Sequence, residues 1–273
     1  MILYVLILAI LQGITEFLPV SSSGHLALGS YLFKGFEHPG IIFEILLHCA
    51  TSIAVIIYLR KELWNMLKSL FIFNSVKENS GAADLSNEGV KYRRLFLIVI
   101  VATIPTGVIG FFLRETAEKA FGTDWMVAAG FLVTGCVLFA SRFFSANGKN
   151  IFDISFGQAL LIGVFQGIAV FPGVSRSGMT ITAGLLTECK PEASAKFSFL
   201  LSLPAIFGAL ILDIKDLNSI KSEYFLTFLI GMIVAAVVGY FSIKLVVSVT
   251  KKWKLHYFAP YCILLGIILL IIK

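Results

Sequence analysis

The segment TEFLPVSSSGHL, Thr15–Leu26, places a carboxylate, three consecutive serines and a histidine within a strongly apolar part of the chain. Such groups are costly in hydrocarbon, where one charged side chain at the bilayer centre costs about 2.5–3.5 kcal/mol on insertion scales. Pro19 and Gly24 bracket the serines and are typical of a helix break. The segment therefore predicts a broken membrane helix whose polar groups serve a site.

The composition of the whole chain fits a membrane protein. Its 273 residues are 58% hydrophobic and 14% charged, with a mean hydropathy of +0.92, whereas soluble domains are about half apolar and a quarter charged. We expect one integral membrane domain over residues 1–273. Six apolar stretches are long enough, or nearly so, to cross a bilayer: Ile41–Leu59, Leu95–Leu113, Met126–Ala140, Phe197–Leu212, Phe225–Val249 and Tyr257–Ile272.

The basic residues indicate an orientation rather than a nucleic-acid partner. The net charge is +6, and the positive-inside rule places basic loops in the cytoplasm. We read Lys77–Lys91 as a polar loop, and Met1–Leu11 lacks the basic start of a signal peptide. The cytoplasmic groups would be Arg60, Lys61, Lys68, Lys77, Lys91, Arg93 and Arg94, and later Lys244, Lys251, Lys252 and Lys254.

A second copy of the opening segment lies 154 residues downstream. Residues 12–24 and 166–178 share eight identities in thirteen positions without a gap. The match includes Gln12-Gly13-Ile14 on Gln166-Gly167-Ile168. Such self-similarity predicts two structural repeats, one over about 1–144 and the other over about 155–273.

The repeat predicts the topology. Each copy begins with a break, at Pro19–Gly24 or Pro172–Gly178, and continues with three apolar spans. A re-entrant hairpin adds no net crossing, so an odd number of spans turns the second copy upside down. We expect an all-α polytopic protein with an inverted-topology repeat, six transmembrane helices and two re-entrant helical hairpins. The two breaks should face each other around a polar cavity.

The two breaks differ where chemistry would take place. Glu16 aligns with Val170, and Ser22 aligns with Arg176. Helix N-termini bind anions, and a guanidinium forms a two-pronged contact with phosphate oxygens. A carboxylate beside such a site repels an anion unless a divalent cation bridges them. The pattern predicts a phosphate or diphosphate site assisted by Mg²⁺ or Ca²⁺.

Several of these residues have plainer interpretations. The serines could serve merely to permit close helix packing, and Glu16 with Arg176 could form a buried salt bridge that locks the hairpins. His25 could merely form a hydrogen bond with a backbone carbonyl. We interpret His48 as structural or supporting, and the role of Glu44 stays undecided.

Three motifs resemble those of the undecaprenyl-diphosphatase (bacitracin-resistance) family. They are QGITEFLPVSSSGH at 12–25, PGVSRSGMT at 172–180 and FEILLHCAT at 43–51. The resemblance spans nearly the whole chain. It implies a phosphatase of the bacterial cytoplasmic (inner) membrane, open to the outer face, that converts undecaprenyl diphosphate to undecaprenyl phosphate and orthophosphate. Such an enzyme recycles the lipid carrier of cell-wall synthesis, confers bacitracin resistance and needs a divalent cation.

The resemblance also implies residue roles. Arg176 would grip the diphosphate, and Glu16, helped by Gln12, would hold the metal or act as a base. His25 would be an acid, a base or an orienting group. Ser22 resembles the nucleophile, with Ser21 or a water as rivals. Many members have Glu where this chain has Gln12, so a metal here has one anionic ligand fewer. The remaining substrate-binding residues would be Ser21, Ser23, Gly24, Ser175, Ser177 and Thr180.

A transporter is the main alternative. Inverted repeats with broken helices are typical of secondary transporters, and a polyprenyl-phosphate flippase would use the same anion site. A carrier, however, has no need of the Ser22 hydroxyl beside a carboxylate. Whether the chain forms a homodimer is left open by the sequence.

Overall fold

The computed structural model describes residues 2–32, 41–71, 82–144, 148–213 and 224–272, and these residues form helices joined by turns. No strand occurs within these ranges. The elements are α1 (Ile2–Thr15), α2 (Ser22–Leu32), α3 (Ile41–Tyr58), α4 (Arg60–Phe71), α5 (Ala82–Phe121), α6 (Asp124–Ala140), η1 (Ser141–Phe143), η2 (Ile151–Asp153), α7 (Phe156–Ile168), α8 (Arg176–Leu186), α9 (Pro191–Asp213), α10 (Phe225–Lys251), η5 (Leu255–Phe258) and α11 (Ala259–Ile271).

Both predicted breaks are present. The first separates α1 from α2, and the second separates α7 from α8. Adding 154 to the ends of α2, Ser22 and Leu32, gives the ends of α8, Arg176 and Leu186. Corresponding sequence positions therefore begin and end corresponding helices.

Four helices are long and apolar enough to cross a membrane among the described residues, namely α5, α6, α9 and α10. A fifth span results if α3 and α4, which meet at an angle of 80°, count as one. The expected span Tyr257–Ile272 is divided between η5 and the 13-residue α11, which is short for a core of about 30 Å. Length and composition alone thus reach four or five spans, not six.

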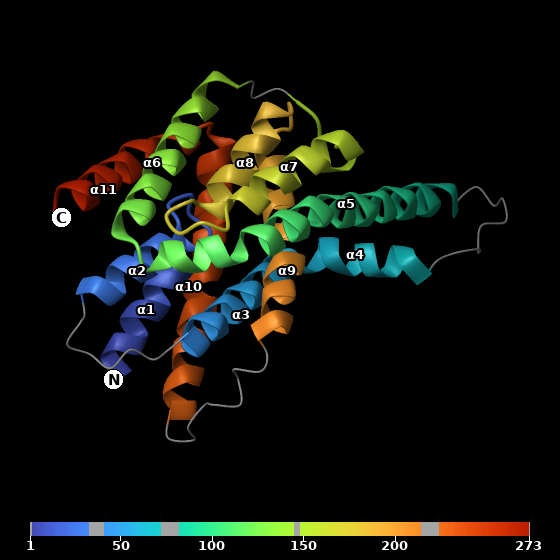
Figure 1. Cartoon of the computed structure of the whole chain (residues 1–273). Helices are drawn as coiled ribbons and strands as arrows, with labels where there is room; N and C mark the ends of the chain where they lie inside the picture. Colours follow the sequence, from blue (N-terminus) through green and yellow to red (C-terminus); the bar gives the residue numbers. More distant parts are fainter. Residues whose placement is uncertain (1, 33–40, 72–81, 145–147, 214–223, 273) are drawn as a thin grey trace.

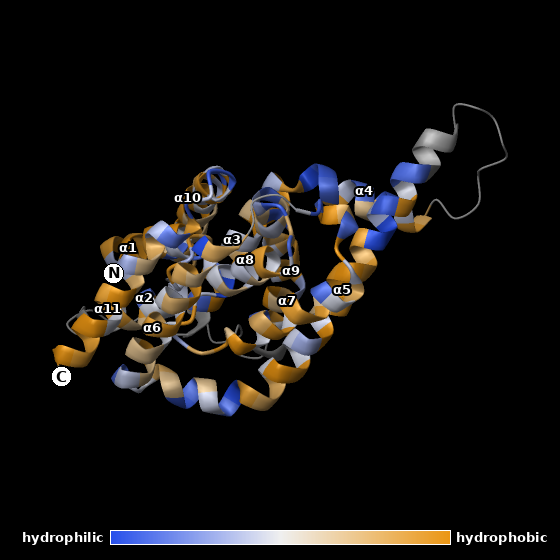
Figure 2. Ribbon diagram, turned by 90° about the horizontal axis from the view of Figure 1, so that it is seen from above, coloured by the Kyte–Doolittle hydropathy of each residue, from blue (hydrophilic) through white to orange (hydrophobic). Residues whose placement is uncertain are grey.

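The prediction of a loop over Lys77–Lys91 is wrong from residue 82 onward. α5 begins at Ala82 and runs for 40 residues, while residues 77–81 lie outside the described ranges. Ala82, Ala83 and Leu85 are strong helix formers, and 82–91 contains no proline, so polarity did not prevent a helix. Figure 2 shows the result, an α5 with an apolar middle and polar residues toward both ends.

Helices from the two halves of the chain pack against each other, including the first helix of each broken pair, α1 and α7. α1 packs on α10, α7 packs on α5, and α6 packs on α11 (Figure 1). Glycines allow the close approach: a Cβ on Gly13 would lie 2.8 Å from Cβ of Val238, and a Cβ on Gly167 would lie 2.7 Å from Cβ of Ile109. Gly13 and Gly167 correspond in the repeat, so equivalent glycines permit equivalent crossings.

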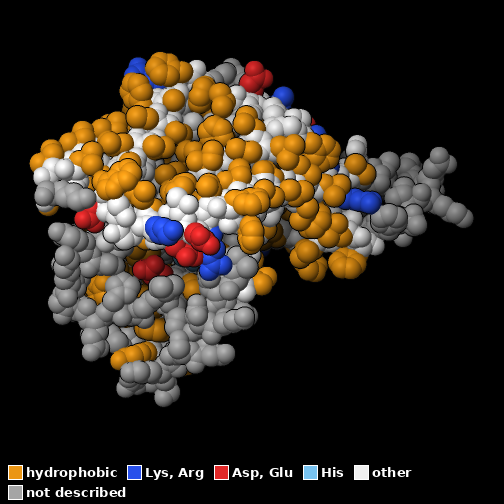
Figure 3. Space-filling model, viewed as in Figure 1, with side chains coloured by type: hydrophobic (Ala, Val, Ile, Leu, Met, Phe, Trp, Pro, Cys, Tyr) orange, Lys and Arg blue, Asp and Glu red, His pale blue; other side chains and the backbone are white. Residues whose placement is uncertain are grey.

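Apolar side chains occupy both the interior and the surface. The largest buried side chains include Phe17, Phe43, Phe131, Phe197 and Phe199. Figure 3 shows hydrophobic side chains over most of the described surface on one face. A broad exposed apolar surface is typical of a protein surrounded by lipid.

Candidate active site

The two breaks lie against each other near the centre of the molecule, where the blue and yellow loops meet in Figure 1. Ser177 Oγ donates to the carbonyl of Leu18 at 3.2 Å. A Cβ on Gly24 would lie 2.9 Å from Cα of Gly173. The prediction that the breaks face each other is confirmed, and they touch directly at these two points. The polar cavity expected between them stays a prediction.

Serines build the first turn of each helix after a break. The N–H of Gly24 donates to Ser21 Oγ at 3.2 Å, and the N–H of Gly178 donates to Ser175 Oγ at 3.0 Å. Serine is a preferred cap because its hydroxyl satisfies an otherwise unpaired helical N–H. A second hydroxyl lies 3.2 Å from each cap, which pairs Ser21 with Ser23 and Ser175 with Ser177. These hydroxyls therefore shape two adjoining helix N-termini.

The backbone of the first break is strained at Ser21. Its φ is 69°, in the left-handed region, which costs a residue other than glycine about 1–2 kcal/mol. The second break adopts positive φ at Gly173 instead, with φ 85°. Position 19, which matches Gly173, holds a proline that cannot take positive φ. The left-handed turn in the first break thus falls on Ser21, and strained backbone tends to occur at functional sites.

Glu16 is the centre of a buried hydrogen-bond network. Its Oε2 accepts from Ser22 Oγ at 2.7 Å and from Gln12 Nε2 at 3.0 Å. Its Oε1 pairs with Nη2 of Arg176. The Glu16 side chain is 3% exposed and that of Arg176 is 17% exposed. A charge this deep is tolerated because it is paired and hydrogen-bonded.

His48 joins this network from α3. Its Nδ1 lies 3.4 Å from Oε2 of Glu16 and 3.1 Å from Nε2 of Gln12. The sequence interpretation assigned His48 a structural or supporting role, and the structure places it directly against the predicted catalytic carboxylate. The available signal was an ionisable group within an apolar helix, which by default suggests function.

Two polar atoms of the network are buried without a hydrogen-bond partner among the described residues. They are Nη1 of Arg176, a donor, and Oε1 of Gln12, an acceptor. An unsatisfied buried group costs about 1–3 kcal/mol, and in a native structure it often marks a place for a ligand or ion. The donor suits an anion and the acceptor suits a cation.

His25 is directed toward a different partner. Its Nδ1 lies 2.7 Å from the carbonyl oxygen of Ser21, and its Nε2 lies 2.7 Å from the hydroxyl of Tyr261. Both ring nitrogens are therefore engaged without Glu16. The acid–base role expected for His25 stays a prediction.

Thr180 also lies apart from the carboxylate. Its hydroxyl donates to the carbonyl of Arg176 at 2.9 Å and pairs with the hydroxyl of Ser198 from α9. The residue thus contributes to the packing of α8 on α9, and phosphate binding by Thr180 stays a prediction.

The donor atoms around Glu16 can be compared with the needs of a metal. No group of three or more His, Cys, Asp or Glu side chains suited to a metal occurs within the described residues. The Glu16 carboxylate and the unpartnered Oε1 of Gln12 are nevertheless both hard oxygen donors, and Mg²⁺ commonly takes only one or two protein oxygens together with substrate phosphates. The residues therefore fit a divalent cation that is coordinated partly by these protein oxygens and partly by oxygens of a phosphate group.

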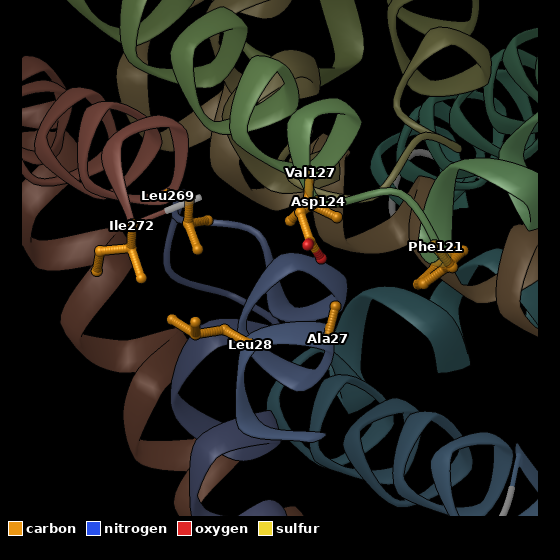
Figure 4. Close-up of a pocket in the computed structure, with 7 residues that line it drawn as sticks. All are labelled: Ala27, Leu28, Phe121, Asp124, Val127, Leu269 and Ile272. Carbon is orange, nitrogen blue, oxygen red and sulfur yellow. The ribbon is translucent and has the colours of Figure 1, made fainter. Parts of the chain in front are cut away.

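An apolar groove begins beside the first hairpin (Figure 4). α2 contributes Ala27 and Leu28, two and three residues beyond His25, and α5, α6 and α11 form the other walls. Asp124 is the charged residue in the lining, and its carboxylate points toward α2 in Figure 4. The remaining lining residues are Phe121, Val127, Leu269 and Ile272.

The chain is similar to known proteins over nearly its full length. A family model described as "Bacitracin resistance protein BacA" matches residues 5–268. An undecaprenyl-diphosphatase of Methanosphaera stadtmanae is 41% identical over 274 residues, which cover 100% of this chain and 98% of the relative. One of Desulforapulum autotrophicum is 40% identical over 268 residues, 97% of this chain and 96% of the relative. One of Alkaliphilus metalliredigens is 37% identical, with the same coverage of both chains.

Proposed function

The chain belongs to the bacitracin resistance protein BacA family, and from that premise we propose that it hydrolyses undecaprenyl diphosphate to undecaprenyl phosphate and orthophosphate. The observation that carries the proposal is Arg176, a largely buried guanidinium that pairs with Glu16 and whose Nη1 has no hydrogen-bond partner among the described residues. A diphosphate oxygen is the natural acceptor for that donor. The released undecaprenyl phosphate would return to cell-wall synthesis as the lipid carrier.

Ser22 is the best-placed nucleophile. Its hydroxyl already donates to Glu16 at 2.7 Å, so the carboxylate can take the proton as the oxygen attacks the terminal phosphorus. The bond between that phosphorus and the bridging oxygen breaks, and undecaprenyl phosphate leaves. Water then releases orthophosphate from Ser22. Arg176 neutralises the charge on the transferring group, as phosphoryl transfer requires.

A divalent cation held by Glu16 and Gln12 would supply electrostatic stabilisation of the phosphate oxygens. The unpartnered Oε1 of Gln12 supports this assignment. His48 lies beside the same carboxylate, with its Nδ1 3.4 Å from Oε2 of Glu16, and this nitrogen accepts from Nε2 of Gln12 at 3.1 Å. Gln12 also donates to Oε2 at 3.0 Å, so His48 would act through Gln12 to keep Oε2 directed toward Ser22 while Arg176 occupies Oε1.

The protein is a multi-pass membrane protein, and we assign it two re-entrant hairpins and six spans related by an inverted repeat. The exchange of partners supports this arrangement, because α1 packs on α10 of the second half and α7 packs on α5 of the first. η5 with α11 would be the sixth span. The basic loops would face the cytoplasm, and the site would open to the outer face of the cytoplasmic membrane.

The groove beside α2 is the proposed place for the polyprenyl chain. Its lining is mainly apolar, and it starts two residues from His25 on the helix that begins with Ser22. The site residues named above come from one chain, so hydrolysis would need no second subunit. The rival reading, a polyprenyl-phosphate flippase, gains no support from the relatives, whose names describe a phosphatase.

Phosphate release from a polyprenyl diphosphate by the purified protein in detergent tests the proposal. We expect release that stops with a chelator, resumes with added Mg²⁺ or Ca²⁺, and is absent with the matching polyprenyl monophosphate. Arg176→Ala is the matched inactive variant. Absence of release by a folded, metal-supplied wild-type protein would overturn the proposal, and transport of the monophosphate across vesicles would then favour the flippase.

A further inference from the structure

Tyr261, near the end of the chain, reaches the first hairpin. Its hydroxyl lies 2.7 Å from Nε2 of His25, and the two rings are nearly parallel, with 8° between their planes. The edge of Phe131 packs on the same imidazole, with 5.3 Å between ring centroids. The His25 ring is thus held between α6 and α11, two helices that pack on each other.

The geometry determines which nitrogen of His25 carries the hydrogen. The Ser21 carbonyl can only accept, and Nδ1 of His25 lies 2.7 Å from its oxygen. Nδ1 must therefore be the N–H nitrogen. In the neutral ring Nε2 is then an acceptor, and the Tyr261 hydroxyl is positioned to donate to it.

The carbonyl that His25 holds belongs to the strained residue of the break. Ser21 has φ 69°, whereas the matching residue of the second break, Ser175, has an ordinary φ of −76°. The second break also has Met179 in place of His25. The imidazole and the left-handed turn therefore occur together in one half of the chain and are both missing from the corresponding positions of the other.

The left-handed turn sets the direction of the next residue, Ser22. We infer that Tyr261 is a positioning residue that acts through His25. The Tyr261 hydroxyl fixes the imidazole so that its Nδ1–H donates to the Ser21 carbonyl and keeps Ser21 in the left-handed backbone conformation. Ser22 Oγ is thereby held against Glu16. The inference rests on the proposed hydrolysis for its kinetic consequence. Its geometric content, the tautomer of His25, stands independently of any activity.

The first experiment compares Tyr261→Phe with wild type in the phosphate-release assay. Removing one hydroxyl should lower kcat by about tenfold and leave KM within about twofold, because the substrate still binds while Ser22 is aimed less well. Tyr257→Phe is the matched control, since it removes an exposed hydroxyl from η5 and should change neither constant. An unchanged kcat for a folded Tyr261→Phe would overturn the inference.

Substitutions of His25 separate positioning from chemistry. The backbone N–H of residue 25 donates to the Ser21 carbonyl at 3.2 Å and remains in every variant. In His25→Asn, Nδ2 takes the place of Nδ1 as the side-chain donor to Ser21, whereas His25→Ala has no side-chain donor. We expect the Asn variant to keep at least about ten times the kcat of the Ala variant. Equal inactivity would mean that Nε2 itself takes part in the reaction, and it would overturn the positioning role.

A double variant and a spectrum complete the test. Adding Tyr261→Phe to His25→Ala should cause little further loss, because the two side chains act in series; additive losses would overturn the inference. Ring ¹⁵N resonances of His25, assigned by their loss in His25→Asn, should show the Nδ1–H tautomer, and an Nε2–H tautomer would overturn it. A wild-type protein that shows this tautomer but releases no phosphate would refute the proposed function alone.

Discussion

Arg176 and Glu16, 160 residues apart in the chain, form an ion pair that joins the second break to the first. The pair uses one nitrogen of the guanidinium and one oxygen of the carboxylate. Nη1 of Arg176 stays unpartnered among the described residues, while the second oxygen of Glu16 accepts from Ser22 and Gln12. The ion pair and the proposed substrate-binding role therefore use different atoms of the same side chains.

This division of atoms leads to a prediction for Arg176. Arg176→Ala should lower thermal stability, because Glu16 loses one donor, at a cost of about 1–3 kcal/mol while its other partners remain. Arg176→Lys should recover the stability but not the turnover, since one ammonium nitrogen cannot contact Glu16 and a phosphate oxygen in the way that two separate guanidinium nitrogens can. Melting curves in detergent, beside phosphate-release assays, check both. Arg142→Lys is the control, since the Arg142 guanidinium lies over the rings of Phe139 and Phe143. Wild-type turnover by Arg176→Lys would show that turnover does not need two separate guanidinium nitrogens.

Glu16→Gln tests the carboxylate. The substitution keeps the size of the side chain, so the protein should stay folded. It removes the negative charge of Glu16. Turnover should fall by at least about a hundredfold, the scale for losing one preorganised electrostatic group. Calorimetric titration with Mg²⁺ in the presence of a nonhydrolysable diphosphate should show weaker binding than wild type. Unchanged turnover would remove Glu16 from the mechanism.

His48→Ala tests the supporting role that the sequence interpretation assigned to His48. Because His48 accepts from Nε2 of Gln12, and the same amide donates to Oε2 of Glu16, the loss of His48 should reduce kcat/KM by about 10–100-fold, as for other residues that orient a catalytic group. His256→Ala is the matched control, since this histidine lies in η5 beside Tyr257. Equal kinetics for both variants would show that His48 only fills space in α3.

The two ends of α5 test the topology. In a background without the native cysteines, Lys119→Cys should react with an impermeant maleimide in intact cells, and Glu88→Cys should react only after lysis. Both positions are exposed on α5 and lie outside its apolar middle. The reverse pattern would overturn the proposed orientation. Two further positions that the predicted topology places on opposite sides of the membrane, Ser80 and Asn218, lie outside the described residues.

Leu28→Trp tests the groove as the site of the polyprenyl chain. A larger ring should fill the space between α2 and α11 and raise KM for a long polyprenyl diphosphate several-fold, while KM for a short-chain diphosphate stays near wild type. Leu245→Trp, on the exposed face of α10, is the control. An equal effect on both chain lengths would place the lipid elsewhere.

The positions of the two breaks, and the correspondence between them, could be predicted from the sequence. Proline, glycine and capping serine act locally, through φ and through hydroxyls that satisfy the first N–H groups of a helix. The start of α2 at Ser22 and of α8 at Arg176 follows from that local chemistry. The all-helical class followed from apolar stretches that must satisfy their own backbone in lipid.

The number of spans and the length of α5 could not be predicted as reliably. Polar residues at 82–91 looked like a loop, yet they continue a helix whose apolar middle lies further on. Polarity reports where a segment meets water, and it does not by itself end a helix. The 80° bend between α3 and α4 likewise depends on packing that no local pattern shows.

The sequence alone determined which residue types the site contains, because a glutamate, a guanidinium and paired serines at two matched breaks have few other uses in a membrane. Only the tertiary structure decided their partners. It brought His48 to Glu16 and turned His25 toward Tyr261, 236 residues away. It also left Nη1 of Arg176 without a partner within the ranges that the structure describes. Hydrogen bonds act over about 3 Å, so partners are decided by how helices distant in the chain pack together, and that packing is a property of the whole fold.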